Sequence, residues 1–115
     1  MLSFKNRFHG HGSLAYVYRK GKNLRSKLIT LKFLTNYYRR FSRVSVVVSK
    51  KVKKTAIGRN RIRRRVYEII YPLINNFEQI FDVVLIINQP EIDNLSYQEL
   101  KDKITTLFQE AHLIK

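Results

Sequence analysis

Apolar residues recur with two different spacings along the chain, and the spacings predict which segments are strands and which are helices. In residues 28–34 and 44–49, alternate side chains form two sets that would point to opposite faces of a strand, and β-branched residues are frequent. This pattern predicts two strands. We expect these two strands to pair antiparallel, because a short turn joins them. Residues 80–87 are apolar almost throughout, which is typical of a central strand covered on both faces.

Apolar positions with helical spacing predict the first two helices. Ser13 is expected to cap a short helix over residues 14–20, which Gly21 ends. The main helix is predicted over residues 59–71, with its apolar stripe facing the core. Pro72 is expected to kink or end it, because proline lacks the amide hydrogen that a helix needs.

A capping box marks the start of the last helix. Ser96 followed by Glu99 three positions later predicts a helix over residues 97–111. Residues 22–27 are interpreted as a basic connector and residues 36–40 as a turn. The element order is therefore α-β-β-α-β-α, which predicts an α+β two-layer sandwich with a small mixed sheet.

Charge is segregated along the chain to an unusual degree. Net charge is +15; residues 1–67 hold 20 Lys or Arg and no acid, whereas residues 68–115 hold 3 basic residues and all 8 acids. A network of surface salt bridges would interleave the signs, so the first half carries a field that needs an external anion. Nucleic acid fits better than an anionic membrane, since the apolar faces are needed for the core.

The basic charge is densest in residues 50–65, where nine of sixteen residues are Lys or Arg. This stretch enters the main helix at its N-terminus, where free amide groups add about half a positive charge. We expect it to bind the phosphates of a nucleic acid. The candidate binding residues are Lys50, Lys51, Lys53, Lys54, Arg59, Asn60, Arg61, Arg63, Arg64 and Arg65.

Domain organisation and location follow from length and composition. A chain of 115 residues is sized for one domain. Residues 1–12 are expected to be a flexible basic arm, because two glycines disfavour a helix there, and residues 13–115 a single RNA-binding domain. The absence of cysteine fits the reducing environment of a cytoplasmic protein, and no apolar run is long enough to span a membrane, so no membrane partner is expected.

Enzyme-type constellations are missing from the sequence. Asp82, Asp93 and Asp102 lack the spacing of magnesium ligands, no Ser-His-Asp arrangement is suggested, and there is no Gly-rich phosphate loop. We therefore assign this chain no catalytic residue, no metal site and no bound cofactor. Tyr18, with Arg19 beside it, suits either a core position or the stacking of an unpaired base.

The basic stretch also carries a specific signature. Residues 46–51 are an apolar strand ending in Ser-Lys-Lys, residues 59–64 read Arg-Asn-Arg-Ile-Arg-Arg, and Glu68 follows. This combination resembles the protein subunit of bacterial ribonuclease P, over roughly residues 10–112. In this pattern Tyr67 departs from the arginine that is usual before the glutamate. Two further departures are Leu14, where an aromatic is more usual, and Arg63, where Lys is common.

The resemblance implies both a fold and a function. The implied fold is ribosomal-protein-like, with a left-handed β-α-β crossover where general rules give a right-handed one. The implied function is the removal of 5′ leaders from precursor tRNA, with the RNA subunit holding the catalytic Mg²⁺ and the protein supplying binding. The basic stretch would contact the catalytic RNA, and no obligate protein partner is implied. A cleft for the leader would be lined by Tyr18, Arg19, Lys32, Ser49 and Lys51.

Two other functions remain open at this point. A ribosomal or other structural RNA-binding protein would use the same basic helix without any role in cleavage. A stand-alone nuclease would need catalytic groups that the sequence does not suggest.

Overall fold

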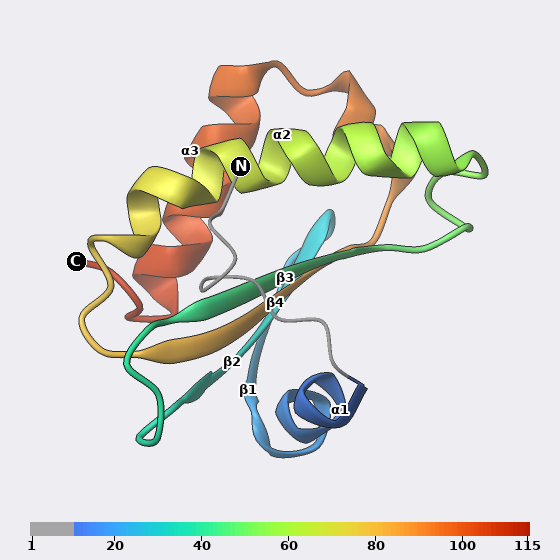
Figure 1. Cartoon of the computed structure of the whole chain (residues 1–115). Coiled ribbons are helices and arrows are strands. Elements are labelled where there is room, and N and C mark those ends of the chain that lie inside the picture. Colours follow the sequence, from blue (N-terminus) through green and yellow to red (C-terminus); the bar gives the residue numbers. More distant parts are fainter. Residues whose placement is uncertain (1–10) are drawn as a thin grey trace.

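The computed structural model describes the backbone from residue 11 to residue 115 and the side chains from residue 15 onward. The elements in chain order are α1 (His11–Lys20), β1 (Lys22–Arg25), β2 (Ile29–Thr35), β3 (Arg43–Val48), α2 (Ala56–Ile74), β4 (Phe81–Ile87), the short 3₁₀ helix η2 (Pro90–Asn94) and α3 (Tyr97–Glu110) (Figure 1). The α+β class is confirmed, and the predicted arm lies largely outside the described residues. Helix α1 begins at His11, earlier than the predicted cap at Ser13.

The strands form one mixed sheet in the order β1-β2-β4-β3. β2 pairs antiparallel with both β1 and β4, and β3 pairs parallel with β4. The predicted direct pairing of the strands now seen as β2 and β3 is therefore wrong. β4 lies between them, because the most apolar strand is the one that gains most from neighbours on both edges. The implied left hand of the β3-α2-β4 crossover stays a prediction.

Strand β1 was missed and belongs to the segment interpreted as a connector. Its four residues, Lys22–Arg25, are mostly exposed and carry no apolar alternation. An edge strand of this kind is held by backbone hydrogen bonds to its single neighbour, so it can form without alternating apolar and polar side chains. The element order is consequently α-β-β-β-α-β-α rather than α-β-β-α-β-α.

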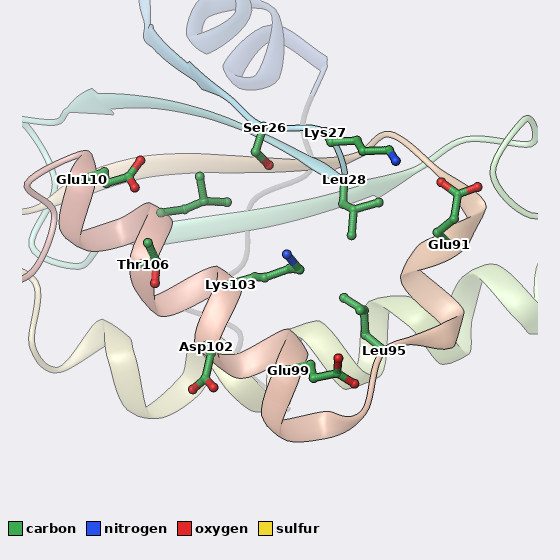
Figure 2. Close-up of a pocket in the computed structure, with 11 residues that line it drawn as sticks. Ser26, Lys27, Leu28, Glu91, Leu95, Glu99, Asp102, Lys103, Thr106 and Glu110 are labelled. Carbon is green, nitrogen blue, oxygen red and sulfur yellow. The ribbon is translucent and has the colours of Figure 1, made fainter.

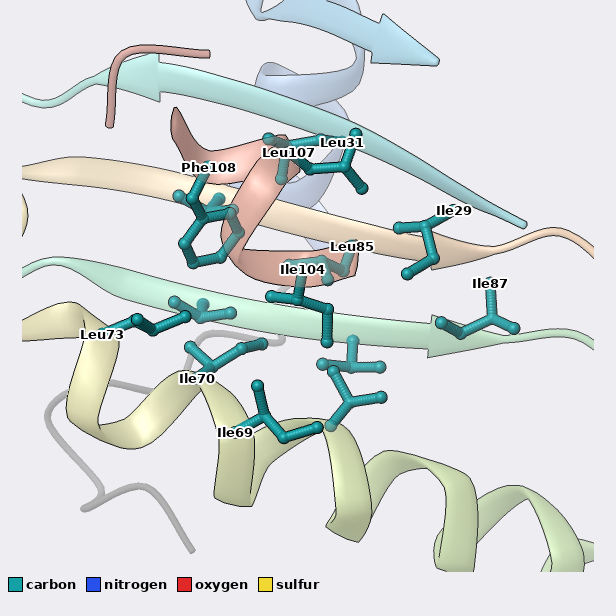
Figure 3. Packing of buried hydrophobic residues seen from close by; sticks show 14 of the residues in the cluster. Ile29, Leu31, Ile69, Ile70, Leu73, Leu85, Ile87, Ile104, Leu107 and Phe108 are labelled. Atoms are coloured by element: carbon teal, nitrogen blue, oxygen red, sulfur yellow. The ribbon is translucent and has the colours of Figure 1, made fainter. Parts of the chain in front are cut away.

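Helices cover the two faces of the sheet unequally. α2 and α3 pack over one face, and α1 lies on the other (Figure 1). Figure 3 shows Ile69 and Ile70 of α2 gathered with Ile104 and Phe108 of α3 and with Leu85 of β4. This main core lies between the sheet and the α2–α3 layer, as a two-layer sandwich predicts. The short helix α1 adds a partial third layer.

Helix α2 is longer than predicted at both ends. Thr55 caps it, since its Oγ1 accepts a hydrogen bond of 3.0 Å from the amide of Gly58. Pro72 does not end the helix, which continues to Ile74. Leu73 lies in the core cluster and anchors the last turn, which offsets the hydrogen bond that proline cannot make.

Helix α3 begins as the sequence predicted. The amide of Glu99 donates to Ser96 Oγ at 3.1 Å, and the amide of Ser96 donates to Glu99 Oε1 at 3.0 Å, which confirms the capping box. The bond from the Ser96 backbone holds the pKa of the Glu99 carboxyl below its usual value. The capping box thus fixes where the acidic half of the chain turns back over the sheet.

Candidate nucleic-acid interface

The predicted basic stretch forms one continuous surface, made by the loop after β3 and the first turns of α2. The loop is not free: Val52 is buried in the core, and its amide and that of Lys53 both donate to the carbonyl of Ser49. The capped N-terminus of α2 follows directly. Lysines of the loop and arginines of the helix are therefore held by a fixed backbone.

Four of the nine cations of this stretch are already bound within the chain. Lys53 Nζ lies 2.7 Å from Asp93 Oδ2 in an ion pair. The Arg59 guanidinium donates to the carbonyl oxygens of Lys53 and Lys54, at 3.0 and 2.9 Å. These contacts tie the loop to the helix, so part of the predicted phosphate-binding charge serves the fold.

Arg63 and Arg65 are the other two cations with partners inside the chain. Arg65 Nη2 donates to the carbonyl of Leu95 at 2.9 Å, which joins α2 to the turn before α3. Arg63 Nη2 donates to Asn60 Oδ1 on the surface of the helix. Both arginines are only partly exposed. Each therefore has a partner inside the chain, and its role in RNA binding stays a prediction.

The remaining five cations are exposed and make no hydrogen bond or ion pair within the described part of the chain. They are Lys50, Lys51, Lys54, Arg61 and Arg64. All lie on the loop or the first three turns of α2, where the helix dipole adds to their field. This group, the free cations, is the part of the predicted stretch that is available to phosphates.

Two of the residues predicted to line a leader cleft, Tyr18 and Lys32, lie together on the sheet face under α1. Val17 of α1 is buried against Val84, and the next residue, Tyr18, is 42% exposed rather than in the core. Lys32 Nζ lies 5.4 Å from the centre of the Tyr18 ring and donates to Asn23 Oδ1 at 2.8 Å. Partial burial raises the pKa of the Tyr18 phenol, which keeps it protonated. The open question about Tyr18 is thus answered in favour of a surface position.

The five predicted cleft residues are not gathered at one point. Lys32 of β2 is paired with Val84, whereas β3 ends beside Ile87, one residue before Ser49. From strand geometry, Ser49 and Lys51 therefore lie roughly 13 Å farther along the sheet and roughly 10 Å across it. They mark the other end of a long path.

The partly exposed side chains of Val47 and Ile86 form part of the floor of that path. Arg19, the fifth predicted residue, is exposed and turns to Tyr16, with 5.9 Å between its guanidinium carbon and the ring centre. The structure therefore brings Tyr18 and Lys32 together and leaves Arg19 on the rim of the helix.

Tyr67, where the resemblance has an arginine, points to the sheet. The amide of Val46, on the edge strand β3, donates to Tyr67 Oη at 3.1 Å. The phenol satisfies a backbone donor that would otherwise lie at a sheet edge. At this position the side chain therefore turns to the sheet and fixes α2 on it.

One hollow of the described residues is lined mostly by the acidic half of the chain. It has a volume of about 700 Å³ and lies between α3, η2 and the turn from β1 to β2 (Figure 2). Its lining carries the carboxylates of Glu91, Glu99, Asp102 and Glu110 together with the ammonium groups of Lys27 and Lys103. Because its charged groups are mainly negative, this hollow is a poorer place for phosphates than the free cations of the basic stretch.

Among the side chains that the structure describes, from residue 15 onward, no three His, Asp or Glu lie close enough together to hold a metal ion. No helix of the described backbone is both long enough and apolar enough to cross a membrane. Residues 9–12, which read His-Gly-His-Gly within the predicted arm, lie outside the described side chains.

Comparisons with known proteins agree on one family. The family model described as Ribonuclease P matches residues 2–112. The chain is 31% identical over 114 residues to the ribonuclease P protein component of a Pseudanabaena species, covering 99% of this chain and 97% of that one. It is 32% identical over 111 residues to that of Clostridium acetobutylicum, covering 96% and 92%.

Solved structures show the same fold. The RNase P protein of Staphylococcus aureus superposes with a TM-score of 0.85 at 20% identity, covering 96% of this chain and 98% of that one. The RNase P protein of Thermotoga maritima superposes with a TM-score of 0.80 at 23% identity, covering 90% and 96%.

Proposed function

Because the chain belongs to the ribonuclease P family, as the protein component of a ribonucleoprotein endoribonuclease, we propose that it grips the catalytic RNA and the 5′ leader of precursor tRNA separately. The free cations hold the catalytic RNA. The path beginning at Tyr18 and Lys32 holds the leader. Removal of the leader is assisted because both RNAs are bound by one rigid domain.

The observation that carries this proposal is the placement of the free cations. Five positive groups without a partner among the described residues, on the loop after β3 and the first turns of α2, form a surface suited to a polyanion. Each phosphate that they neutralise releases counterions, which makes binding steeply dependent on salt. A folded RNA supplies phosphates at the density this surface needs.

The leader is the better partner for the α1 face. An exposed tyrosine ring with an ammonium group beside it offers a stacking surface for one base and a charge for its phosphate. Such a site is tolerant of sequence, because every base has a π face. Leaders of precursor tRNAs differ in sequence, so tolerance is what this step requires.

The protein's part in the reaction is binding. In this family the catalytic Mg²⁺ is expected in the RNA subunit, and the side chains described above bind and position RNA without exchanging protons with it. A cytoplasmic location is part of the same proposal, because precursor tRNA is its substrate.

Reconstitution tests the proposal directly. The purified protein is mixed with precursor tRNA at low Mg²⁺, with and without the cognate catalytic RNA, and release of the leader is measured. We expect cleavage only when the RNA is present, and faster cleavage with protein than without. Cleavage by the protein alone would indicate a stand-alone nuclease, and RNA binding without stimulation would indicate a structural RNA-binding protein.

A matched pair of variants tests the leader site. Tyr18→Ala is expected to weaken binding of precursor tRNA to the holoenzyme by about 1–3 kcal/mol, while binding of mature tRNA is unchanged. Tyr97→Ala is the control, because Tyr97 is 49% exposed and lies on α3, in the acidic half. Equal losses in both variants would contradict a leader contact at Tyr18.

A further inference from the structure

The loop between β2 and β3, residues 36–42, displays two neighbouring tyrosines almost fully to solvent. Tyr37 is 85% exposed and Tyr38 is 97% exposed. Arg39 and Arg40 follow and are exposed as well. Single apolar side chains on a surface are common, but two adjacent rings with two cations beside them make a surface of defined chemistry. We call residues 37–40 the tyrosine loop.

Both ends of the tyrosine loop are held by one buried carboxylate. Asn36 Nδ2 donates to Asp82 Oδ2 at 2.9 Å, before the loop. Arg43, after the loop, donates from Nε to Asp82 Oδ1 at 2.9 Å and from Nη2 to Asp82 Oδ2 at 2.7 Å. Asp82 is only 5% exposed, so this ion pair is well shielded from water. The loop is thereby closed at its base.

Further bonds fix the backbone on either side. The amide of Tyr38 donates to Asn36 Oδ1 at 2.9 Å, and the amide of Asn36 donates to the carbonyl of Ile80 at 2.8 Å. Ser42 Oγ accepts from the amide of Phe81 at 3.0 Å. A loop held in this way presents its rings at a low entropic cost, which is a property of binding sites that are formed before the ligand arrives.

The tyrosine loop borders the face that carries the leader path. A hollow of about 570 Å³ is lined by Tyr16 of α1, Leu34 of β2, Tyr37, Tyr38 and Arg39. Leu34 is two residues beyond Lys32 on the same strand, so both point to the same face of the sheet, about 7 Å apart. The loop and the Tyr18–Lys32 pair are therefore neighbours on one surface.

We propose that the tyrosine loop is a second stacking site for unpaired RNA bases, which takes leader nucleotides beyond those held at Tyr18. This rests on the proposed function, because it extends the same path to the opposite end of the sheet from Ser49 and Lys51. Tyrosine rings stack on bases of any sequence, and the two arginines neutralise the phosphates between them. The nearest carboxylate, that of Asp82, is already paired with Arg43 and does not repel the RNA.

The tyrosine loop has two other conceivable partners, another protein and the catalytic RNA, and the experiment below distinguishes both from the leader. Tyrosine and arginine are also enriched at protein interfaces, and the catalytic RNA also has unpaired bases. The leader is favoured because the loop is continuous with the leader path and is separate from the free cations of α2. These are distinguishable outcomes, since only a leader contact depends on leader length.

The experiment uses the reconstituted holoenzyme and precursor tRNAs that differ only in the length of the leader. Tyr37→Ala plus Tyr38→Ala is expected to weaken binding of the substrate with a long leader about tenfold. Binding of a substrate whose leader ends near Tyr18 is expected to be unchanged, as is binding of the catalytic RNA. Tyr37→Phe plus Tyr38→Phe keeps the rings and is expected to bind like the unchanged protein. Tyr97→Ala is the control for loss of an exposed tyrosine elsewhere.

The inference is overturned if the double alanine variant binds long and short leaders equally well, or weakens both equally. It is also overturned if only binding of the catalytic RNA falls. Because both rings are exposed, the thermal midpoint of the variant should stay within about 2 °C, so a misfolded sample is recognised separately. Failure of the unchanged protein to stimulate cleavage would instead refute the proposed function.

Discussion

Removing two of the free cations should lower the salt dependence of RNA binding, whereas removing a cation that is bound inside the chain should not, although both changes lower the net charge. Arg61→Ala plus Arg64→Ala removes two exposed guanidiniums that have no partner within the described chain. If each held one phosphate, the slope of log affinity against log salt would fall by about two. The remaining three free cations would keep a slope of their own.

The magnitude follows from how many cations the structure leaves available. Five free cations contribute a slope of about 4, so between about 50 and 200 mM salt their share of the affinity falls about 250-fold. The three free cations left in the double variant give a slope of about 2.4, so their share falls only about 30-fold over the same range. Counting all nine cations of the stretch would instead give a slope of about 7 to 8.

The matched comparison is Arg65→Ala, which removes the same charge from a cation bound inside the chain. Its bond to the Leu95 carbonyl is lost, so we expect a loss of about 1 kcal/mol in the free energy of unfolding. For a chain of 115 residues that lowers Tm by about 4 °C, while the salt slope stays unchanged. Lys101→Ala, on the exposed side of α3, is the control for a charge removed from the acidic half.

The assay is a titration of the catalytic RNA with each variant at a series of salt concentrations, together with a thermal melt. The reasoning fails if Arg65→Ala lowers the slope as much as each of the two free arginines does. It also fails if Lys101→Ala does so. Either result would mean that the protein binds RNA through its net charge rather than through a defined surface.

Three further predictions concern stability. Asp82→Ala removes the partner of the partly buried Arg43 guanidinium and should cost about 3 kcal/mol, or about 12 °C in Tm. In a double-mutant cycle, Arg43→Ala plus Asp82→Ala should cost less than the sum of the single changes. Tyr67→Phe should cost about 1 kcal/mol in a denaturant titration, because the Val46 amide loses its acceptor, and RNA binding should keep its salt slope. The stability that the ionised Glu99 carboxylate contributes is measured by comparison with Glu99→Gln. It should be present at neutral pH and lost as the pH falls below about 4.5 and through the lowered pKa of the folded state, because a depressed carboxyl pKa stabilises only the ionised form. A stability difference that grows toward acid would contradict this.

Local rules in the sequence predicted the parts of the fold that depend on near neighbours. The stripe Ile62, Val66, Ile69 is buried as its spacing required, and the capping box at Ser96 starts α3 where it should. The central position of β4 also followed from its composition. These features depend on residues within a few positions of each other, so one sequence is sufficient to read them.

The candidate site was predicted as a set, and the structure shows which of its cations have partners inside the chain. The charged stretch could be found from the sequence, whereas the cation beside Tyr18 is Lys32 and not its chain neighbour Arg19. The division between free and bound cations could not, because Arg65 finds its acceptor thirty positions away, at Leu95, and Lys53 finds Asp93 forty positions away. Periodicity carries no signal for contacts of that range.

Charge segregation, the basic entry to the main helix and the family signature were therefore determined by the sequence alone, whereas the cap of that helix at Thr55 was not predicted. Only the tertiary structure decided which strands lie on either side of β4 and which arginines bond within the chain. It also decided that the two ends of the tyrosine loop meet at Asp82. The physical reason is the same in each case. Hydrogen bonds and ion pairs between distant segments form only where packing of the core brings their donors and acceptors together.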